Sequence, residues 1–274
     1  MGRIIAVANQ KGGVGKTTTV INLAASLALA DRRVLLVDVD PQANLTSGLS
    51  LKGHASSAGT IYDALTADPP PPDLAAFVLP TAIQGLWLVP SDRNLTGAEI
   101  ELVSLAGREH RLRELIRPLR DQYDHVFIDC PPSLGLLTLN GLVAADTVLI
   151  PLHCEYFALE GLADLVATLR RVRAAFNPAL DIEGVLLTML DERTNLGQQV
   201  ALDVRGFFED KVFRTIIPRN VRLAEAPSHG MPVVLYDAKS RGAEAYLALA
   251  REFLARTPPA DAARARAPEG SHHG

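Results

Sequence analysis

A glycine-rich segment near the start of the chain has the composition of a phosphate-binding loop. It reads Lys11-Gly12-Gly13-Val14-Gly15-Lys16-Thr17-Thr18, with an apolar run at residues 4–8 before it and a helical pattern after it. In such a strand–loop–helix unit, glycines let successive backbone N–H groups point at one anion, and the helix N-terminus adds the positive end of its dipole. We therefore expect Lys16 to face the β- and γ-phosphates of a nucleotide and the Thr17 hydroxyl to ligate Mg²⁺.

The second lysine of this loop, Lys11, departs from the common form of the motif. The usual pattern G-x-x-x-x-G-K-[ST] would place glycine at position 10, where this chain has Gln10 followed by Lys11. Two lysines provide more positive charge than the cradle of one triphosphate requires. Lys11 is therefore either a solvated surface charge or a ligand for a phosphate that belongs to a second molecule, and the spacing alone favours neither.

Three aspartates stand at the ends of predicted strands. Asp38 and Asp40 end one strand, and Asp129 ends another after the apolar residues 126–128. Because ligands of an open parallel sheet bind at the carboxyl ends of its strands, these carboxylates should converge near the phosphates. Asp129 fits an aspartate that holds Mg²⁺ through a water molecule. The alternative is that such aspartates only cap the turns that follow them.

Short apolar runs alternate with amphipathic stretches along most of the chain, which predicts the elements that would position these residues. The predicted strands cover residues 4–8, 34–37, 86–89, 126–128, 148–150 and 182–187. The predicted helices cover residues 16–30, 109–120, 136–144, 160–175, 198–208 and 243–255. This alternation predicts an α/β fold of the P-loop NTPase type: a mostly parallel, doubly wound sheet with helices on both faces.

The composition limits the class of protein. The chain has 274 residues, 48% of them hydrophobic, a formal net charge of −4 and two cysteines, Cys130 and Cys154. These values are typical of a soluble globular protein without a disulfide framework, and neither a transmembrane segment nor a signal peptide is expected. We interpret residues 1–256 as one domain, residues 68–73 as a stiff proline-rich surface loop, and residues 257–274 as a disordered tail.

Three further segments make the sequence similar to a known family. They are Val37-Asp38-Val39-Asp40-Pro41-Gln42-Ala43-Asn44, Ile128-Asp129-Cys130-Pro131-Pro132-Ser133 and the run from Ile217 to Gly230. Together with the two-lysine loop, they resemble the deviant Walker A ATPases of the ParA/MinD family, and the last is characteristic of the chromosomal ParA (Soj) branch. The resemblance extends from Arg3 to about Leu254.

The resemblance implies roles for individual residues. Lys11 would reach across an ATP-dependent homodimer to the partner's phosphates, and Asp40 would position or activate the attacking water. Asp38 would support the Mg²⁺ shell. Met189 and the segment Pro218-Arg219-Asn220 would lie beside the adenine, and the absence of an Asn-Lys-x-Asp guanine-reading motif also favours ATP. The implied activity is a slow ATPase that is stimulated by DNA and by a ParB-type centromere-binding partner.

A basic stretch follows the predicted helix at 198–208. Seven cations belong to it or flank it: Arg193, Lys211, Arg214, Arg219, Arg222, Lys239 and Arg241. Taken alone, such a stretch is more often a solvated face than a binding site. The resemblance implies contacts to the backbone of nonspecific double-stranded DNA, with Arg193 and Arg222 the foremost candidates. The expected setting is then cytoplasmic and nucleoid-associated, in chromosome or plasmid partitioning.

Three alternatives share the phosphate-binding loop. A MinD-like switch at a membrane surface would need an amphipathic C-terminal helix, whereas residues 257–274 are interrupted by prolines and lack an apolar stripe. An iron–sulfur reductase would need two cluster cysteines in set places, and we interpret Cys130 and Cys154 as buried small residues instead. An ATP-using biosynthetic ligase would need a substrate motif, and we find none.

Overall fold

The computed structural model describes residues 2–155, 158–190 and 195–256, and only the backbone of residues 195 and 196. Its strands are β1 (Arg3–Val7), β2 (Val34–Asp38), β3 (Leu79–Pro80), β4 (Leu86–Val89), β5 (His125–Asp129), β6 (Thr147–His153), β7 (Asp181–Leu190) and β8 (Ile217–Pro218). They form one sheet in the order β3-β4-β2-β5-β1-β6-β7-β8. Every pair is parallel except β3 and β4, so seven strands direct their carboxyl ends to one edge of the sheet.

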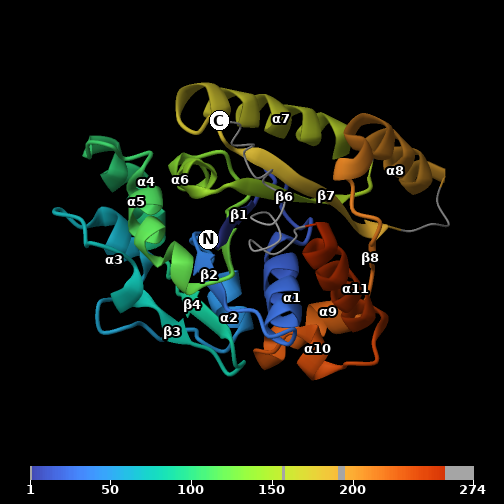
Figure 1. Cartoon of the computed structure of the whole chain (residues 1–274), viewed down its shortest axis with the longest axis horizontal. Coiled ribbons are helices and arrows are strands. Elements are labelled where there is room, and N and C mark those ends of the chain that lie inside the picture. Colours follow the sequence, from blue (N-terminus) through green and yellow to red (C-terminus); the bar gives the residue numbers. More distant parts are fainter. Residues whose placement is uncertain (1, 156–157, 191–194, 257–274) are drawn as a thin grey trace, which may run out of the picture.

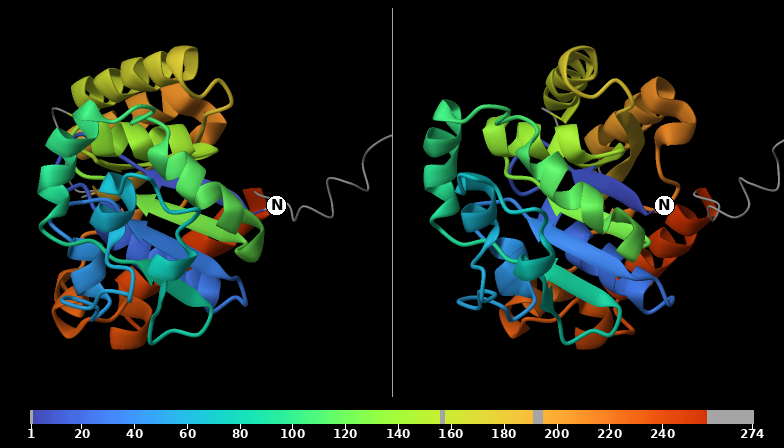
Figure 2. Two further views of the ribbon diagram at one scale, coloured as in Figure 1. Left: turned by 90° about the vertical axis from the view of Figure 1, so that its left-hand side faces the viewer. Right: turned by 60° about the vertical axis from the view of Figure 1, so that its left-hand side comes forward.

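Helices cover both faces of this sheet (Figures 1 and 2). They are α1 (Lys16–Ala28), α2 (Asn44–Gly48), α3 (Ile61–Thr66), α4 (Leu95–Glu101), α5 (Arg111–Ile116), α6 (Leu136–Ala144), α7 (Ala158–Ala175), α8 (Asn195–Phe208), α9 (Val221–Glu225), α10 (Val233–Tyr236) and α11 (Arg241–Arg256). Helices α3 to α8 pack on one face, and α1, α2 and α9 to α11 pack on the other.

The alternation of side chains along the strands divides the interior into two cores. In β1, Ile4 and Ala6 belong to the core under α3 to α8, whereas Ile5 and Val7 belong to the core under α1 and α11. Successive side chains of a strand point to opposite faces, so a strand between two helical layers is apolar on both sides. This explains why the central strands are rich in valine, isoleucine and leucine.

The predicted α/β fold is confirmed, and all six predicted strands are present. Their ends agree with the prediction within about two residues, except that β6 and β7 each extend further at the carboxyl end. The sequence pattern missed β3 and β8, which have two residues each and contain a proline, as is typical of strands at sheet edges. It also missed the short helices α2, α3, α4, α9 and α10. Residues 68–73 contain neither helix nor strand, in agreement with the predicted loop.

The last described helix, α11, ends at Arg256. The predicted tail, residues 257–274, lies outside the described residues, and the division of the chain at residue 256 stays a prediction. Among the helices that the structure describes, none combines the length and the apolar character needed to cross a lipid bilayer.

Candidate functional site

The glycine-rich loop joins β1 to α1 at the carboxyl edge of the sheet. Gly13 and Gly15 have φ values of 72° and 87°, in the left-handed region that glycine adopts without strain. Gly15 is also the N-cap of α1, so the loop turns directly into the helix N-terminus. This arrangement leaves the amino-terminal N–H groups of α1 available to an anion, as the sequence predicted.

A cavity of about 890 Å³ opens beside this loop. It is lined by ten of the predicted nucleotide-binding residues: Gly12, Gly13, Gly15, Lys16, Thr17, Thr18, Met189, Pro218, Arg219 and Asn220. Asp40, the predicted water-positioning residue, lines it as well. Two predicted residues, Lys11 and Val14, do not. The Val14 carbonyl instead accepts a hydrogen bond from the Thr188 hydroxyl at 2.9 Å, which ties the loop to β7.

Lys16 is the cation most deeply placed in this cavity. Its side chain extends along the loop, and its Nζ donates to the Lys11 carbonyl at 3.0 Å. The pKa of Lys16 is lowered, because the effect of burial exceeds the opposing effect of the charge on nearby Asp129. A buried ammonium with one neutral hydrogen-bond partner is poised to accept an anionic ligand, which would supply the missing counter-charge.

Thr17 and Asp129 are in contact at the carboxyl end of β5. The Thr17 hydroxyl donates to Asp129 Oδ2 at 2.7 Å, and Asp129 Oδ1 is buried without a hydrogen-bond partner. Burial, followed by the charge of Asp38, raises the pKa of Asp129 well above its usual value. A buried carboxylate oxygen with no partner next to a hydroxyl fits the oxygen donors that Mg²⁺ takes, so these two residues fit a magnesium site.

The three predicted metal or catalytic aspartates lie close together but do not form one metal cage. Within the described ranges, no group of three or more His, Cys, Asp or Glu side chains is arranged to hold a metal ion. Asp38 is opposite Asp129 in the β2–β5 register, yet both of its oxygens are engaged. They accept hydrogen bonds from the Asp40 N–H and from the N–H and hydroxyl of Thr46. Burial raises the pKa of Asp38 to about 7.

Lys11 does not line the cavity and forms an ion pair with Glu155, just beyond the end of β6. The hydrogen bond from Lys11 lowers the pKa of Glu155. His153 is also near this carboxylate, with its Nδ1 3.6 Å from Oε1. The structure thus gives Lys11 a partner that the sequence pattern did not identify, because Glu155 is 144 residues away in the chain.

The side of the cavity formed by β7 and α9 is irregular. Met189 has a φ of 50°, which is strained for a residue with a side chain, and the β7–β8 register shifts between Thr188 and Leu190. Asn220 caps α9 by accepting a hydrogen bond from the Arg222 N–H at 2.9 Å.

Tyr246 of α11 also lines the cavity, and its hydroxyl is 3.1 Å from the Thr19 hydroxyl. Tyr246 was not predicted, because α11 is over 200 residues from the loop.

The predicted basic residues separate into two groups. The first group is exposed near α9 and the start of α11 and consists of Arg219, Arg222, Lys239 and Arg241. These two helices are in close contact, because a Cβ added to Gly242 of α11 would be only 2.7 Å from Leu223 Cγ of α9. Lys211 and Arg214 lie near the other end of α11, in a second cavity that Arg256 also lines. A helix of 16 residues is about 24 Å long, so α11 separates the groups by roughly that distance. Arg193 lies outside the described residues.

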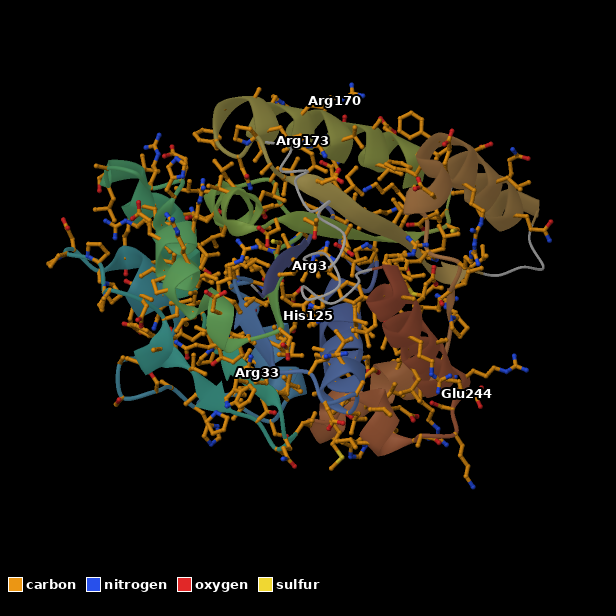
Figure 3. All side chains as sticks on the ribbon, viewed as in Figure 1. Arg3, Arg33, His125, Arg170, Arg173 and Glu244 are labelled. Carbon is orange, nitrogen blue, oxygen red and sulfur yellow. The ribbon has the colours of Figure 1, made fainter. Side chains whose placement is uncertain are left out.

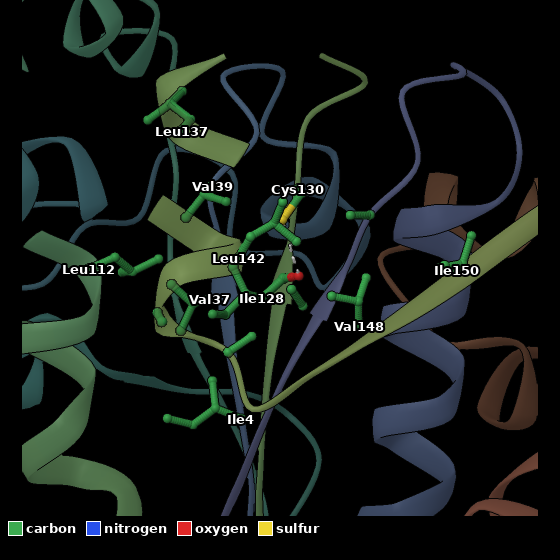
Figure 4. Close-up of a cluster of buried hydrophobic side chains, with 14 of the residues drawn as sticks. Ile4, Val37, Val39, Leu112, Ile128, Cys130, Leu137, Leu142, Val148 and Ile150 are labelled. Carbon is green, nitrogen blue, oxygen red and sulfur yellow. Dashed lines mark hydrogen bonds between the residues drawn. The ribbon is translucent and has the colours of Figure 1, made fainter. Parts of the chain in front are cut away.

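Both cysteines are buried, as predicted, and neither forms a disulfide. Cys130 is packed in the core with Ile128 and Leu142 around it (Figure 4). Burial raises the pKa of both thiols, that of Cys154 to about 11. Thiols in such surroundings remain protonated at neutral pH and are poor ligands for an iron–sulfur cluster.

The chain is similar to known protein families, to named relatives and to solved structures. The AAA domain family matches residues 2–182. The chain is 58% identical to the chromosome partitioning protein ParA of Myxococcus xanthus, over 94% of this chain and 90% of that protein. It is 55% identical to the sporulation initiation inhibitor protein Soj of Bacillus subtilis, over 93% and 99%. A crystal structure described as cobyrinic acid a,c-diamide synthase from Mycobacterium smegmatis, with a bound ATP analogue and magnesium, superposes with a TM-score of 0.76 at 40% identity, over 92% and 93%.

Proposed function

This chain belongs to the ParA/Soj family of chromosome-partitioning ATPases, and on that basis we propose that it is an ATP-driven DNA switch. ATP would join two copies of the chain, and the dimer would bind nonspecific double-stranded DNA in the cytoplasm. A ParB-type partner would then stimulate hydrolysis and release the DNA. The cargo would be a chromosome or a plasmid.

The observation that best supports this proposal is the ion pair of Lys11 outside the cavity. Lys16 and Thr17 suffice for one triphosphate cradle, and Lys11 does not line the cavity but pairs with Glu155, its side chain 34% exposed. A partly exposed lysine on a phosphate-binding loop is suited to the phosphates of a second copy that docks over the cavity. The relatives named ParA and Soj are consistent with such a switch.

The chain's own residues would divide the work of phosphoryl transfer as follows. Lys16 and the N–H groups of the loop would bind the β- and γ-phosphates, and Asp40 would orient the attacking water. Met189, Pro218 and Asn220 would contact the base. Mg²⁺, held by Thr17 and, through water, by Asp129, would neutralise charge on the phosphates, with Asp38 supporting that site from behind.

The deciding experiment measures retention of a nonspecific duplex with ATP, with ADP and without nucleotide. We expect retention with ATP only, because only the dimer doubles the number of phosphate contacts. Lys16→Ala, which removes the cation facing the phosphates, is the matched control and should retain no DNA with any nucleotide. Equal retention in all three nucleotide states would contradict an ATP-controlled DNA switch.

Two other functions give different outcomes in the same assay. The solved structure described as a cobyrinic acid a,c-diamide synthase suggests ATP-dependent amide formation as a second candidate, which predicts no ATP-dependent DNA retention. The relatives with higher identity carry partitioning names, so we favour the DNA switch. A MinD-like membrane switch would instead predict ATP-dependent sedimentation with anionic vesicles.

A further inference from the structure

A closed ring of hydrogen bonds holds the backbone of Asp40 from both sides. The Asp40 N–H donates to Asp38 Oδ1 at 3.2 Å, and the Asp40 carbonyl accepts from the Ser91 hydroxyl at 2.9 Å. Thr46 joins these contacts, because its hydroxyl donates to Asp38 Oδ2 at 2.6 Å and accepts from the Ser91 N–H at 3.0 Å. All four residues are buried.

The ring connects three separate elements. Asp38 ends β2, Thr46 belongs to α2, and Ser91 lies in the segment that follows β4. The Thr46 hydroxyl uses both its proton and its oxygen in the ring, and the Thr46 N–H donates to Asp38 as well, at 2.9 Å. Buried polar networks whose members are all hydrogen-bonded are rigid, because breaking any contact leaves an unpaired group in a medium of low dielectric constant.

Only one member of the ring lines the nucleotide cavity, and that member is Asp40. Its carboxylate is held separately, since Oδ1 accepts the Gln42 N–H at 2.9 Å. Thr46 and Ser91 are buried and do not line the cavity. Any effect of these two residues on a bound nucleotide is therefore indirect. Ser91 acts through the backbone of Asp40, and Thr46 acts through Asp38 and Ser91, which hold that backbone from both sides.

We propose that Thr46 and Ser91 are positioning residues that fix Asp40 for hydrolysis. The inference rests on the proposed role of Asp40 in orienting the attacking water. Phosphoryl transfer depends on placement, and a displacement of about 1 Å can lower a rate on the order of 10²-fold. The ring restrains both sides of the Asp40 backbone, so loss of either hydroxyl loosens the backbone that positions the carboxylate.

The test compares Thr46→Val, which keeps the shape and removes the hydroxyl, with Ser91→Ala. We expect single-turnover ATP hydrolysis to fall about 10- to 100-fold in each variant, while ATP affinity by calorimetry stays within about twofold of the parent. Thr46→Ser, which restores the hydroxyl, should recover most of the rate. Adding Thr46→Val to Asp40→Ala should cause no further loss, because residues that act as a unit are not additive.

Ser26→Ala is the matched control. Ser26 is a buried serine of α1 whose hydroxyl donates to the Asn22 carbonyl at 2.7 Å, and it does not line the nucleotide cavity. This variant should hydrolyse ATP at the parent rate. Parent-like hydrolysis in Thr46→Val and Ser91→Ala, with Asp40→Ala inactive, would overturn the positioning role and leave the proposed function intact. Parent-like hydrolysis in Asp40→Ala would instead overturn the role of Asp40 itself.

Two further outcomes are also decisive. Equal losses of ATP affinity and rate in both ring variants would indicate a purely structural role and overturn the proposal. If Thr46→Val does not fold, the test uses Ser91→Ala and Thr46→Ser. A lowered hydrolysis rate in Ser91→Ala with a parent-like rate in Thr46→Ser supports the positioning role. A parent-like rate in both variants contradicts it.

Discussion

At the scale of single residues, the two lysines of the loop have opposite surroundings. Lys16 is 7% exposed and lies along the loop, whereas Lys11 pairs with a carboxylate. The side chains of Lys11 and Glu155 are 34% and 40% exposed, so their ion pair is at least partly solvated. Such pairs contribute at most about 1 kcal/mol, which a competing phosphate in a dimer can readily replace.

Lys11→Ala should therefore keep measurable ATP affinity and remain monomeric with ATP. The reason is that Lys11 does not line the cavity and would contact only the phosphates of a second copy. Sizing chromatography with ATP and calorimetry measure the two properties. Glu155→Gln is the counterpart, and it should promote dimerisation by up to about 30-fold, because it removes a competitor worth at most about 1 kcal/mol from each of the two Lys11 side chains. A Lys11→Ala variant that dimerises normally would make Lys11 a surface charge.

The sequence predicted those site residues that are contiguous in the chain. Loop residues 11–18 form one segment, and their chemistry follows from composition and spacing. Thr46 and Ser91 could not be predicted in the same way, because they are 45 residues apart and meet only when α2 packs against the end of β4. The engagement of Asp38 Oδ2 was equally inaccessible, since it depends on Thr46. Local patterns identify strand-end carboxylates but not the partners that folding gives them.

At the scale of elements, the same limit affects short helices. Helices α2, α9 and α10 have five, five and four residues, which is little more than one turn and too short for an amphipathic period. Each is stabilised by tertiary contacts, such as the burial of Leu45 and Leu223 against α1 and α11. The central strands were predictable because burial on both faces makes them largely apolar.

Helix α9 presents Arg222 to solvent in a paired state. Its guanidinium contacts Glu225 at 2.8 Å and Asp237 at 3.2 Å, and the hydrogen bond that it donates to Glu225 raises the pKa of Arg222. Arg222→Ala should abolish DNA retention while ATP-dependent dimerisation survives. Arg170→Ala, on the outer surface of α7 (Figure 3), is the matched control and should retain DNA like the parent. Full retention by Arg222→Ala would remove α9 from the DNA-binding surface.

The opposite edge of the sheet contains a buried histidine. His125 begins β5 and packs edge-on against Phe253 of α11, with ring centroids 5.3 Å apart. It pairs with Arg3 in the β1–β5 register, and its backbone N–H donates to the Arg33 carbonyl at 3.3 Å. Its Nδ1 is buried without a hydrogen-bond partner, and burial lowers the pKa of His125 to about 4. The imidazole is therefore neutral in the folded protein.

This histidine should make the fold less stable in acid. Between the unfolded pKa of about 6.5 and the folded value of about 4, only the unfolded chain binds the proton, so stability present above pH 6.5 is lost as the pH falls. The loss attributable to His125 between pH 7.5 and pH 5 is about 2 kcal/mol. Urea unfolding of the parent and of His125→Leu at both pH values measures it. An equal pH dependence in the two proteins would contradict the assignment.

At the scale of the whole molecule, the charge distribution matters more than the total. The chain has a formal net charge of −4, so long-range attraction to DNA is weak and binding must depend on a local surface. The four cations near α9 and the start of α11 are exposed. Among them Arg222 is paired with Glu225 and Asp237, and Lys211 of the other group is paired as well: it donates to Asp181 Oδ2 at 2.8 Å and to the Ile182 carbonyl at 3.0 Å. The contribution of Lys211 and Arg214 to DNA binding stays a prediction, as does that of Arg193.

The salt dependence of DNA binding by the ATP-bound dimer can separate these groups. For roughly 6 to 10 phosphate contacts, raising the salt from about 50 to 200 mM should weaken binding on the order of 10³- to 10⁵-fold, with little sequence preference. Each side chain occurs twice in a dimer, so Lys239→Ala or Arg241→Ala should reduce the slope of log K against log salt by about 1.8. Lys211→Ala should change it less, because that ammonium already has two partners. If Lys211→Ala reduces the slope of log K against log salt by the same amount, the duplex runs along α11 and contacts both groups of cations. Unchanged slopes in all three variants would contradict a phosphate-binding surface at either end of this helix.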